Sequence, residues 1–110
     1  MGARRILVAN ELTSYRQTIA IVLRDLRPHI EVFEAEPRTL DGEVARLEPD
    51  LVICSRVTHT VRQRVANWVE LYPECKPHST FCVGGECRAK REVRLSDILA
   101  LCASLPQRAP

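Results

Sequence analysis

Two short and uninterrupted apolar runs constrain the fold of this chain more than any other feature. The runs are residues 6–9 (Ile-Leu-Val-Ala) and residues 51–54 (Leu-Val-Ile-Cys). A strand has this pattern when both of its faces are buried, as in a parallel sheet that carries helices on both sides. Between the runs, apolar residues from Leu12 to Leu26 recur at helical spacing, and Pro28 ends that helix. The pattern therefore predicts a parallel sheet whose strands are separated by helices.

The rest of the chain continues this alternation of strands and helices. We predict further strands at residues 30–35 and 80–83, and further helices at residues 40–47, 58–72 and 96–105. The helix at 58–72 rests on four residues at intervals of four, three and four: Val61, Val65, Trp68 and Tyr72. We interpret Ser96 as the N-cap of the closing helix.

Such alternation is typical of a three-layer α/β fold, in which one parallel sheet lies between two layers of helices. Right-handed crossovers then place the strands in the flavodoxin-like order 2-1-3-4. The segment after residue 83 is too short for a helical crossover followed by another strand, so we expect a shortened or remodelled C-terminal region. The 110 residues form a single domain, 1–110, with its core at about residues 4–105.

Composition and charge exclude several classes of protein. No apolar run approaches the roughly 18 residues of a membrane span, and no signal peptide precedes the first strand, so we expect a cytoplasmic protein. The net charge of +2 is well below that of a dedicated nucleic-acid-binding domain, and 5% aromatic residues leave little for base stacking. Direct binding of nucleic acid is therefore not expected.

Four segments of the chain resemble the receiver domain of bacterial response regulators. They are residues 6–11, Tyr15-Arg16, residues 48–55 (Glu-Pro-Asp-Leu-Val-Ile-Cys-Ser) and residues 95–100. The resemblance covers residues 4–56 well, residues 57–83 by pattern only, and the last helix weakly. It implies a small signalling module of flavodoxin-like fold.

The residues at the family's phosphorylation site differ in this chain. The resemblance places Asn10 and Glu11 where the family has two magnesium-binding carboxylates, and Ser55 where it has the phosphoacceptor aspartate. A serine hydroxyl cannot form the acyl phosphate of that reaction. Gly84-Gly85 replaces the family's switch serine or threonine, and Lys90, the counterpart of its lysine, follows no recognisable strand. We therefore expect a pseudo-receiver that is not phosphorylated.

This resemblance implies binding rather than catalysis. We expect a module that binds a protein partner in a regulatory or scaffolding role, is not an enzyme and needs no cofactor. Asn10, Glu11 and Ser55 should meet at the carboxyl ends of strands 1 and 3, where doubly wound folds bind ligands. A small-ligand binder or an enzyme that uses this pocket is therefore the alternative.

The cysteines allow a metal or redox role as a further alternative. Four potential metal ligands are spaced C-x2-H-x3-C-x4-C: Cys75, His78, Cys82 and Cys87. The paired-cysteine turn of a zinc site is missing, so we expect no metal. If Gly84-Gly85 forms a two-residue turn, Cys82 lies directly opposite Cys87 at a distance that a disulfide tolerates, although free thiols are usual in the cytosol. Cys54 and Cys102 lie in apolar runs, and we expect both in the core.

A basic stretch precedes the last helix and consists of Arg88, Lys90, Arg91 and Arg94. Interleaved glutamates favour a solvated loop, and a docking patch for an acidic partner or a phosphate backbone is the alternative. The strand at 80–83 leaves an edge that invites pairing with another chain. Either the segment after Gly85 folds back as a hairpin with a charged outer edge, or a second copy covers the edge, which leaves a homodimer open.

Overall fold

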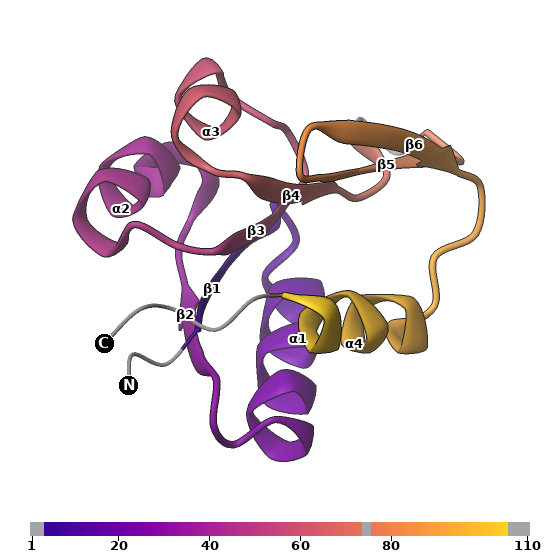
Figure 1. The fold of residues 1–110 in the computed structure, drawn as a ribbon, viewed down its shortest axis with the longest axis horizontal. Coiled ribbons are helices and arrows are strands. Elements are labelled where there is room, and N and C mark those ends of the chain that lie inside the picture. Colours follow the sequence, from indigo (N-terminus) through magenta and orange to yellow (C-terminus); the bar gives the residue numbers. More distant parts are fainter. Residues whose placement is uncertain (1–3, 74–75, 106–110) are drawn as a thin grey trace.

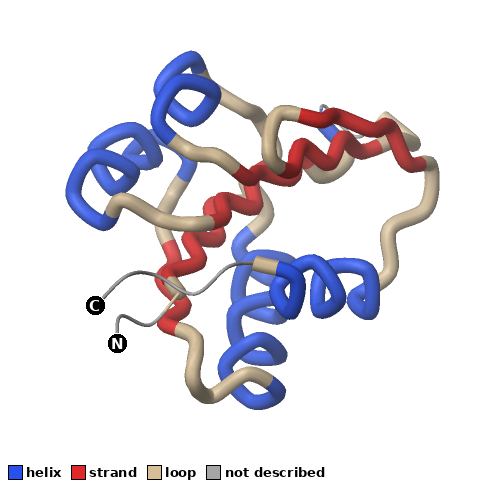
Figure 2. The backbone as a smooth tube through the Cα atoms, viewed as in Figure 1, coloured by secondary structure: helices blue, strands red, loops and turns tan. Residues whose placement is uncertain are grey.

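The computed structural model describes residues 4–73 and 76–105, and in these ranges six strands form one mixed sheet in the order β2-β1-β3-β4-β5-β6 (Figures 1 and 2). The strands are β1 (Arg5–Ala9), β2 (Glu31–Glu34), β3 (Leu51–Cys54), β4 (Asn67–Glu70), β5 (Ser79–Val83) and β6 (Glu86–Lys90). The helices are α1 (Thr13–Leu26), α2 (Leu40–Leu47), α3 (His59–Arg64) and α4 (Leu95–Ser104), and a 3-10 turn, Pro37–Thr39, precedes α2.

The first four strands are parallel and confirm the predicted α/β fold with strand order 2-1-3-4. β1 lies between β2 and β3, with Ile6 paired to Val32 on one side and to Leu51 on the other. β5 and β6 then add an antiparallel hairpin to the edge of this parallel sheet. The C-terminal region is therefore remodelled, as predicted.

Two layers of helices cover the sheet, with α1 and α4 on one face and α2 and α3 on the other (Figure 1). Residues of β1 alternate between the two faces: Ile6 and Val8 pack with α1 and α4, whereas Leu7 and Ala9 pack with α2 and α3. This placement explains why the apolar run of residues 6–9 contains no polar residue. In the described part of the chain, no helix is long and apolar enough to cross a membrane.

The helix predicted at residues 58–72 is wrong over its second half. α3 ends at Arg64, Val65 already has extended backbone, and residues 67–70 form β4, the fourth parallel strand. The strand predicted at 80–83 lies within β5, which runs antiparallel. β4 lies between β3 and β5, so Trp68 and Val69 are buried on opposite faces of the sheet and the strand shows no alternating pattern.

Two smaller details also differ from the predictions. The apolar stripe predicted for the first helix is buried only at its centre, since Leu12 and Leu26 are 67% and 52% exposed. Ser96 is not the N-cap of α4, because the helix begins at Leu95 and the N-cap is Arg94. The Asp97 carboxylate accepts the Arg94 backbone N–H at 2.8 Å, which stabilises the helix start one residue before Ser96.

The C-terminal hairpin has the predicted two-residue turn. Gly84 and Gly85 have φ angles of 59° and 90°, values that favour glycine and match the tight turn of a hairpin. Val83 pairs with Glu86, and Cys82 lies opposite Cys87. The fold-back of the chain after Gly85 is therefore confirmed, and β6 forms the outer edge of the sheet.

Candidate functional site

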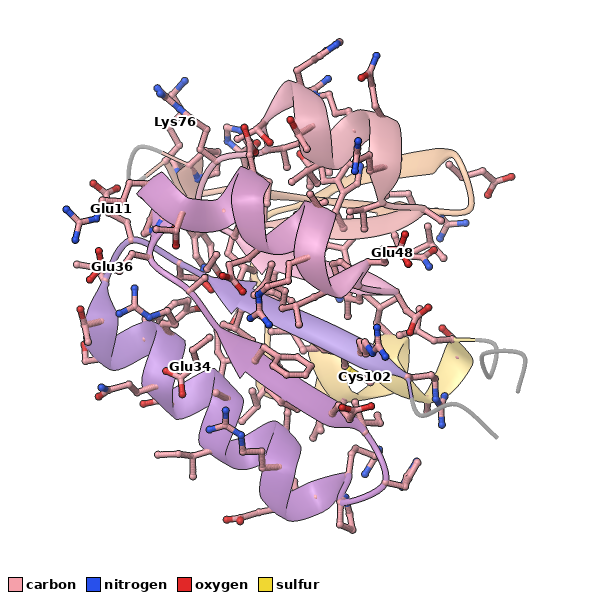
Figure 3. The ribbon with its side chains drawn as sticks, turned by 90° about the vertical axis from the view of Figure 1, so that its left-hand side faces the viewer. Glu11, Glu34, Glu36, Glu48, Lys76 and Cys102 are labelled. Carbon is pink, nitrogen blue, oxygen red and sulfur yellow. A yellow bond between two sulfur atoms is a disulfide. The ribbon has the colours of Figure 1, made fainter. Side chains whose placement is uncertain are left out.

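Polar residues meet where β1 and β3 end, because these parallel neighbours are in register, with Ala9 paired to Cys54. Asn10 and Glu11 follow β1, and Ser55 follows β3. The Glu11 backbone N–H donates a hydrogen bond of 2.8 Å to Ser55 Oγ. The structure thus brings these three residues together at the carboxyl end of the parallel strands, where Figure 3 shows Glu11.

A cavity of about 210 Å³ opens at this junction, which we call the strand-end cavity. Its lining consists of Asn10, Glu11, Leu12, Tyr15, Ser55, Leu71 and Tyr72. The Leu71 backbone N–H donates to the Cys54 carbonyl at 2.8 Å, which places Leu71 and Tyr72 beside Ser55. Sequence reasoning missed both residues because it assigned them to a helix. Pro73 was the available signal, since a proline ends a strand as readily as a helix.

Tyr72 is fixed in place on one wall of the strand-end cavity. Its φ of 44° lies in the left-handed region, which is uncommon for an aromatic residue. Its backbone N–H donates to Ser79 Oγ at 2.9 Å, and its hydroxyl accepts the Val93 backbone N–H at 2.9 Å. The ring therefore connects the end of β4 to the segment that leads into α4.

Asn10 is the most unusual residue of this site. It is 1% exposed, and neither its carboxamide nitrogen nor its oxygen has a hydrogen-bond partner among the described residues. Its backbone carbonyl, by contrast, accepts a hydrogen bond of 3.1 Å from Arg16 Nη1. A buried amide without partners costs about 1–3 kcal/mol of stability. The site therefore contains one donor and one acceptor with unused hydrogen-bonding capacity.

The electrostatics of the strand-end cavity do not match those of a magnesium site. Glu11 is the one carboxylate among its lining residues, and hard divalent cations require several oxygen ligands. The pKa of Tyr15 is raised, first by burial and then by the proximity of Tyr72, so its phenol stays protonated. The cavity thus offers hydroxyl and amide groups together with apolar walls, an arrangement suited to binding.

The two free cysteines of the described chain are buried, and their predicted place in the core is confirmed. Burial, followed by the charge of Glu70, raises the pKa of the Cys54 thiol to about 12. Burial also raises the pKa of Cys102 to about 11. At neutral pH both remain thiols, and the thiolate is the form that acts as a nucleophile.

Two of the four potential metal ligands noted in the sequence form a disulfide with each other in this structure. Cys82 and Cys87 are bonded, with Cα atoms 4.0 Å apart, and so both are unavailable as thiolate ligands in this state. His78 is exposed, and Cys75 lies outside the described residues. Within the described ranges, no group of three His, Cys, Asp or Glu side chains is placed to hold a metal ion.

The basic stretch is a strand edge followed by a helix start, and the loop predicted for it begins only after Lys90. Arg88 and Lys90 belong to β6, and Lys90 Nζ lies 2.7 Å from Asp97 Oδ1 of α4. This hydrogen bond, and then the one from the Arg94 backbone, lowers the pKa of the Asp97 carboxyl. Arg94 Nε lies 3.9 Å from a Glu92 oxygen.

An open groove of about 650 Å³ lies between the β5–β6 hairpin and α4, and we call it the hairpin groove. Phe81 and Val83 of β5 and Leu101 of α4 supply apolar surface, and Val83 is 38% exposed. Arg88 and Lys90 also line the groove. Lys90 is paired with Asp97, whereas Arg88 has no ion-pair partner in the described part of the chain.

Comparisons with family models, with curated proteins and with solved structures found no match to this chain.

Proposed function

We propose that this chain is a receiver-like signalling module that binds a protein partner and accepts no phosphoryl group. The parallel strand order 2-1-3-4 and the alternating helices agree with the fold that such a module requires. Asn10, Glu11 and Ser55 occupy the strand ends at which receivers carry out phosphoryl transfer. This set has one carboxylate, and so it supports binding rather than catalysis.

The hairpin groove is the observation that carries the proposal. Phe81 and Val83 provide an apolar floor, and Arg88 provides a positive charge that has no ion-pair partner among the described residues. Arg91 follows directly after β6 and is exposed, outside the lining of the groove. Interfaces commonly combine an apolar centre with arginine, which pairs well with carboxylates. The partner that fits is therefore a protein segment with apolar side chains and flanking acidic residues.

Affinity capture with the full chain as bait tests this proposal. The bait variant Arg88→Glu/Arg91→Glu reverses the charge of Arg88 in the groove and of Arg91 just after β6. Arg38→Glu is the control, because Arg38 is an exposed arginine of the 3-10 turn and does not line the groove. We expect one set of proteins to be retained by the parent and by Arg38→Glu, and lost from the double variant and in high salt. Equal capture by all three baits contradicts the proposal.

The strand-end cavity supports a second candidate function, the binding of a small neutral ligand. The observation that favours it is the buried Asn10 carboxamide, which has unused donor and acceptor capacity beside the apolar Leu71. The ligand would be a small planar molecule with an amide-like edge. Saturable shifts of backbone NMR signals around the cavity with small amides and heterocycles, lost in Glu11→Ala, would support this function. Absence of saturable shifts across such a set counts against it.

A further inference from the structure

The disulfide lies on the hairpin face opposite to the apolar floor of the hairpin groove. Cys82 belongs to the core cluster on the α2 and α3 side of the sheet, whereas Phe81 packs on the α1 and α4 side. The backbone pairing of β5 with β6 extends from the Gly84-Gly85 turn to Ser79 and Lys90. This pairing keeps Cys82 and Cys87 opposite each other independently of the bond between their sulfur atoms.

The two cysteines differ in their access to solvent. Cys82 is 3% exposed, whereas Cys87 is exposed on the edge strand β6. Both border an open groove of about 550 Å³ between α3 and the hairpin. A thiol reagent therefore reaches Cys87 without unfolding the sheet.

The surroundings of the disulfide favour thiolate chemistry. Arg62 and Arg64 line the same groove, and the Arg62 guanidinium lies 5.6 Å from the centre of the Trp68 ring. Neighbouring positive charge stabilises a thiolate, both when it attacks a disulfide and when it leaves. Both requirements for thiol–disulfide exchange, access and positive charge, are thus present at one end of the hairpin.

We propose that Cys82–Cys87 is a reversible redox site, which dithiols reduce while the rest of the fold stays intact. A thiolate of the dithiol attacks Cys87 Sγ and forms a mixed disulfide, and Cys82 Sγ leaves as a thiolate that takes up a proton. The second thiolate of the dithiol then attacks the first sulfur of the same dithiol, which is bonded to Cys87 Sγ in the mixed disulfide. This step releases Cys87 as a thiolate. Two electrons pass from the dithiol, which becomes a cyclic disulfide, to the cystine.

The fold does not depend on this bond. A disulfide stabilises a protein chiefly by constraining its unfolded chain, and this effect is smallest for a short loop such as the one between Cys82 and Cys87. The Gly84 backbone N–H also donates to Asn67 Oδ1 at 3.1 Å, which ties the turn to β4. The hairpin therefore keeps its own backbone and side-chain contacts after reduction.

Trp68 provides a direct optical signal for the redox state. It is the single tryptophan of the chain, and it pairs with Cys82 across β4 and β5. A disulfide in contact with an excited indole quenches its fluorescence by accepting an electron more readily than a thiol does. Reduction is therefore expected to increase the emission of Trp68.

The experiment uses the full chain with Cys75→Ser in every sample, so that the cysteine outside the described residues does not react. Protein oxidised with oxidised glutathione is treated with dithiothreitol under native conditions, and fluorescence, far-UV circular dichroism and iodoacetamide labelling are followed. We expect brighter emission, labelling at Cys87, an unchanged circular dichroism spectrum, and reversal by oxidised glutathione. Cys54 and Cys102 are expected to stay unlabelled because burial raises the pKa of their thiols.

The variant Cys87→Ser is the matched control, because it keeps Cys82 and Trp68 but cannot form the bond. Its emission is expected to be high and insensitive to reductant. Three results would overturn the proposal: reduction only after a denaturant is added, loss of the circular dichroism signal on reduction, or failure of the oxidant to close the disulfide in the folded protein.

Discussion

At the scale of single residues, two buried asparagines differ in the hydrogen bonding of their side-chain carboxamides. Asn67 is 9% exposed and uses both ends of its carboxamide: Nδ2 donates to the Asp50 carbonyl at 3.0 Å, and Oδ1 accepts the Gly84 N–H at 3.1 Å. It thereby connects β4 to the segment before β3 and to the hairpin turn. Asn10 is even more buried, and both ends of its carboxamide lack a partner among the described residues.

Replacement of each asparagine by leucine separates a structural role from a binding role. Asn10→Leu is expected to raise the free energy of unfolding by about 1 kcal/mol, because leucine has a similar size and removes an unpaired buried amide. Asn67→Leu is expected to lower it by about 2 kcal/mol, because it removes the two hydrogen bonds that the Asn67 carboxamide makes with the Asp50 carbonyl and the Gly84 N–H. Urea denaturation of both variants provides the measurement.

An equal loss of stability in the two variants contradicts this interpretation of Asn10. Such a result means that the Asn10 carboxamide is hydrogen-bonded in solution, for example to a bound water, and that its capacity is not available to a ligand. A gain of stability with Asn10→Leu shows instead that the amide is retained at the expense of stability, as is common for residues of functional sites.

Ser55 gives the second prediction at this scale. Incubation of the protein with acetyl phosphate and magnesium is expected to leave its intact mass unchanged, because Ser55 is a hydroxyl and Glu11 is the one carboxylate lining the cavity. Intact-protein mass spectrometry is the measurement. The addition of one phosphoryl group, whether acid-stable or of the acyl type, contradicts the prediction.

At the scale of elements, Gly85 in the hairpin turn and Gly42 in α2 differ in backbone conformation, because only Gly85 has a positive φ. Gly85 has a φ of 90°, and an added side chain is strained there whatever the available space. Gly85→Ala is therefore expected to lower the free energy of unfolding by about 1–2 kcal/mol. Gly42 lies inside α2 with ordinary backbone and no atom within 4 Å of an added Cβ, so Gly42→Ala is expected to raise it by about 0.5–1 kcal/mol.

Thermal and urea unfolding of these two variants measure the contrast. The same mutation, glycine to alanine, is expected to change the free energy of unfolding in opposite directions at the two positions. The comparison therefore cancels any general effect of adding a methyl group. A Gly85→Ala variant as stable as the parent would mean that the hairpin turn adopts another conformation in solution.

At the scale of the whole molecule, the hairpin decides which edge of the sheet is exposed. β6 covers β5 and becomes the outer strand, and its five residues are all exposed. Charged side chains on an edge strand discourage pairing with another chain. Arg88 and Lys90 supply such charges here.

We therefore expect the protein to be a monomer at micromolar concentration, as measured by light scattering on the eluting species. Arg88→Val/Lys90→Val makes the edge apolar and suited to strand pairing, and this variant is expected to associate. A parent dimer that dissociates on deletion of residues 86–91 contradicts the prediction and shows that β6 pairs with a second copy. A parent dimer that survives this deletion places the contact elsewhere.

The sequence by itself determined the three parallel strands β1, β2 and β3, the convergence of Asn10, Glu11 and Ser55, and the hairpin turn. These features depend on local signals, namely apolar runs, prolines at element ends, and the adjacent glycines Gly84 and Gly85. Strand ends in a parallel sheet then meet for purely topological reasons. The same reasoning placed Cys82 opposite Cys87 across the turn.

Only the tertiary structure decided that residues 67–70 form a strand. Val61, Val65 and Trp68 are all buried, as their helical spacing predicted, but Trp68 is buried as part of β4 between β3 and β5. A four-residue strand with both faces covered carries no periodicity of its own, so its neighbours decide its conformation. Leu71 and Tyr72 reach the strand-end cavity for the same reason, because the position of β4 beside β3 is a long-range contact that no local pattern encodes.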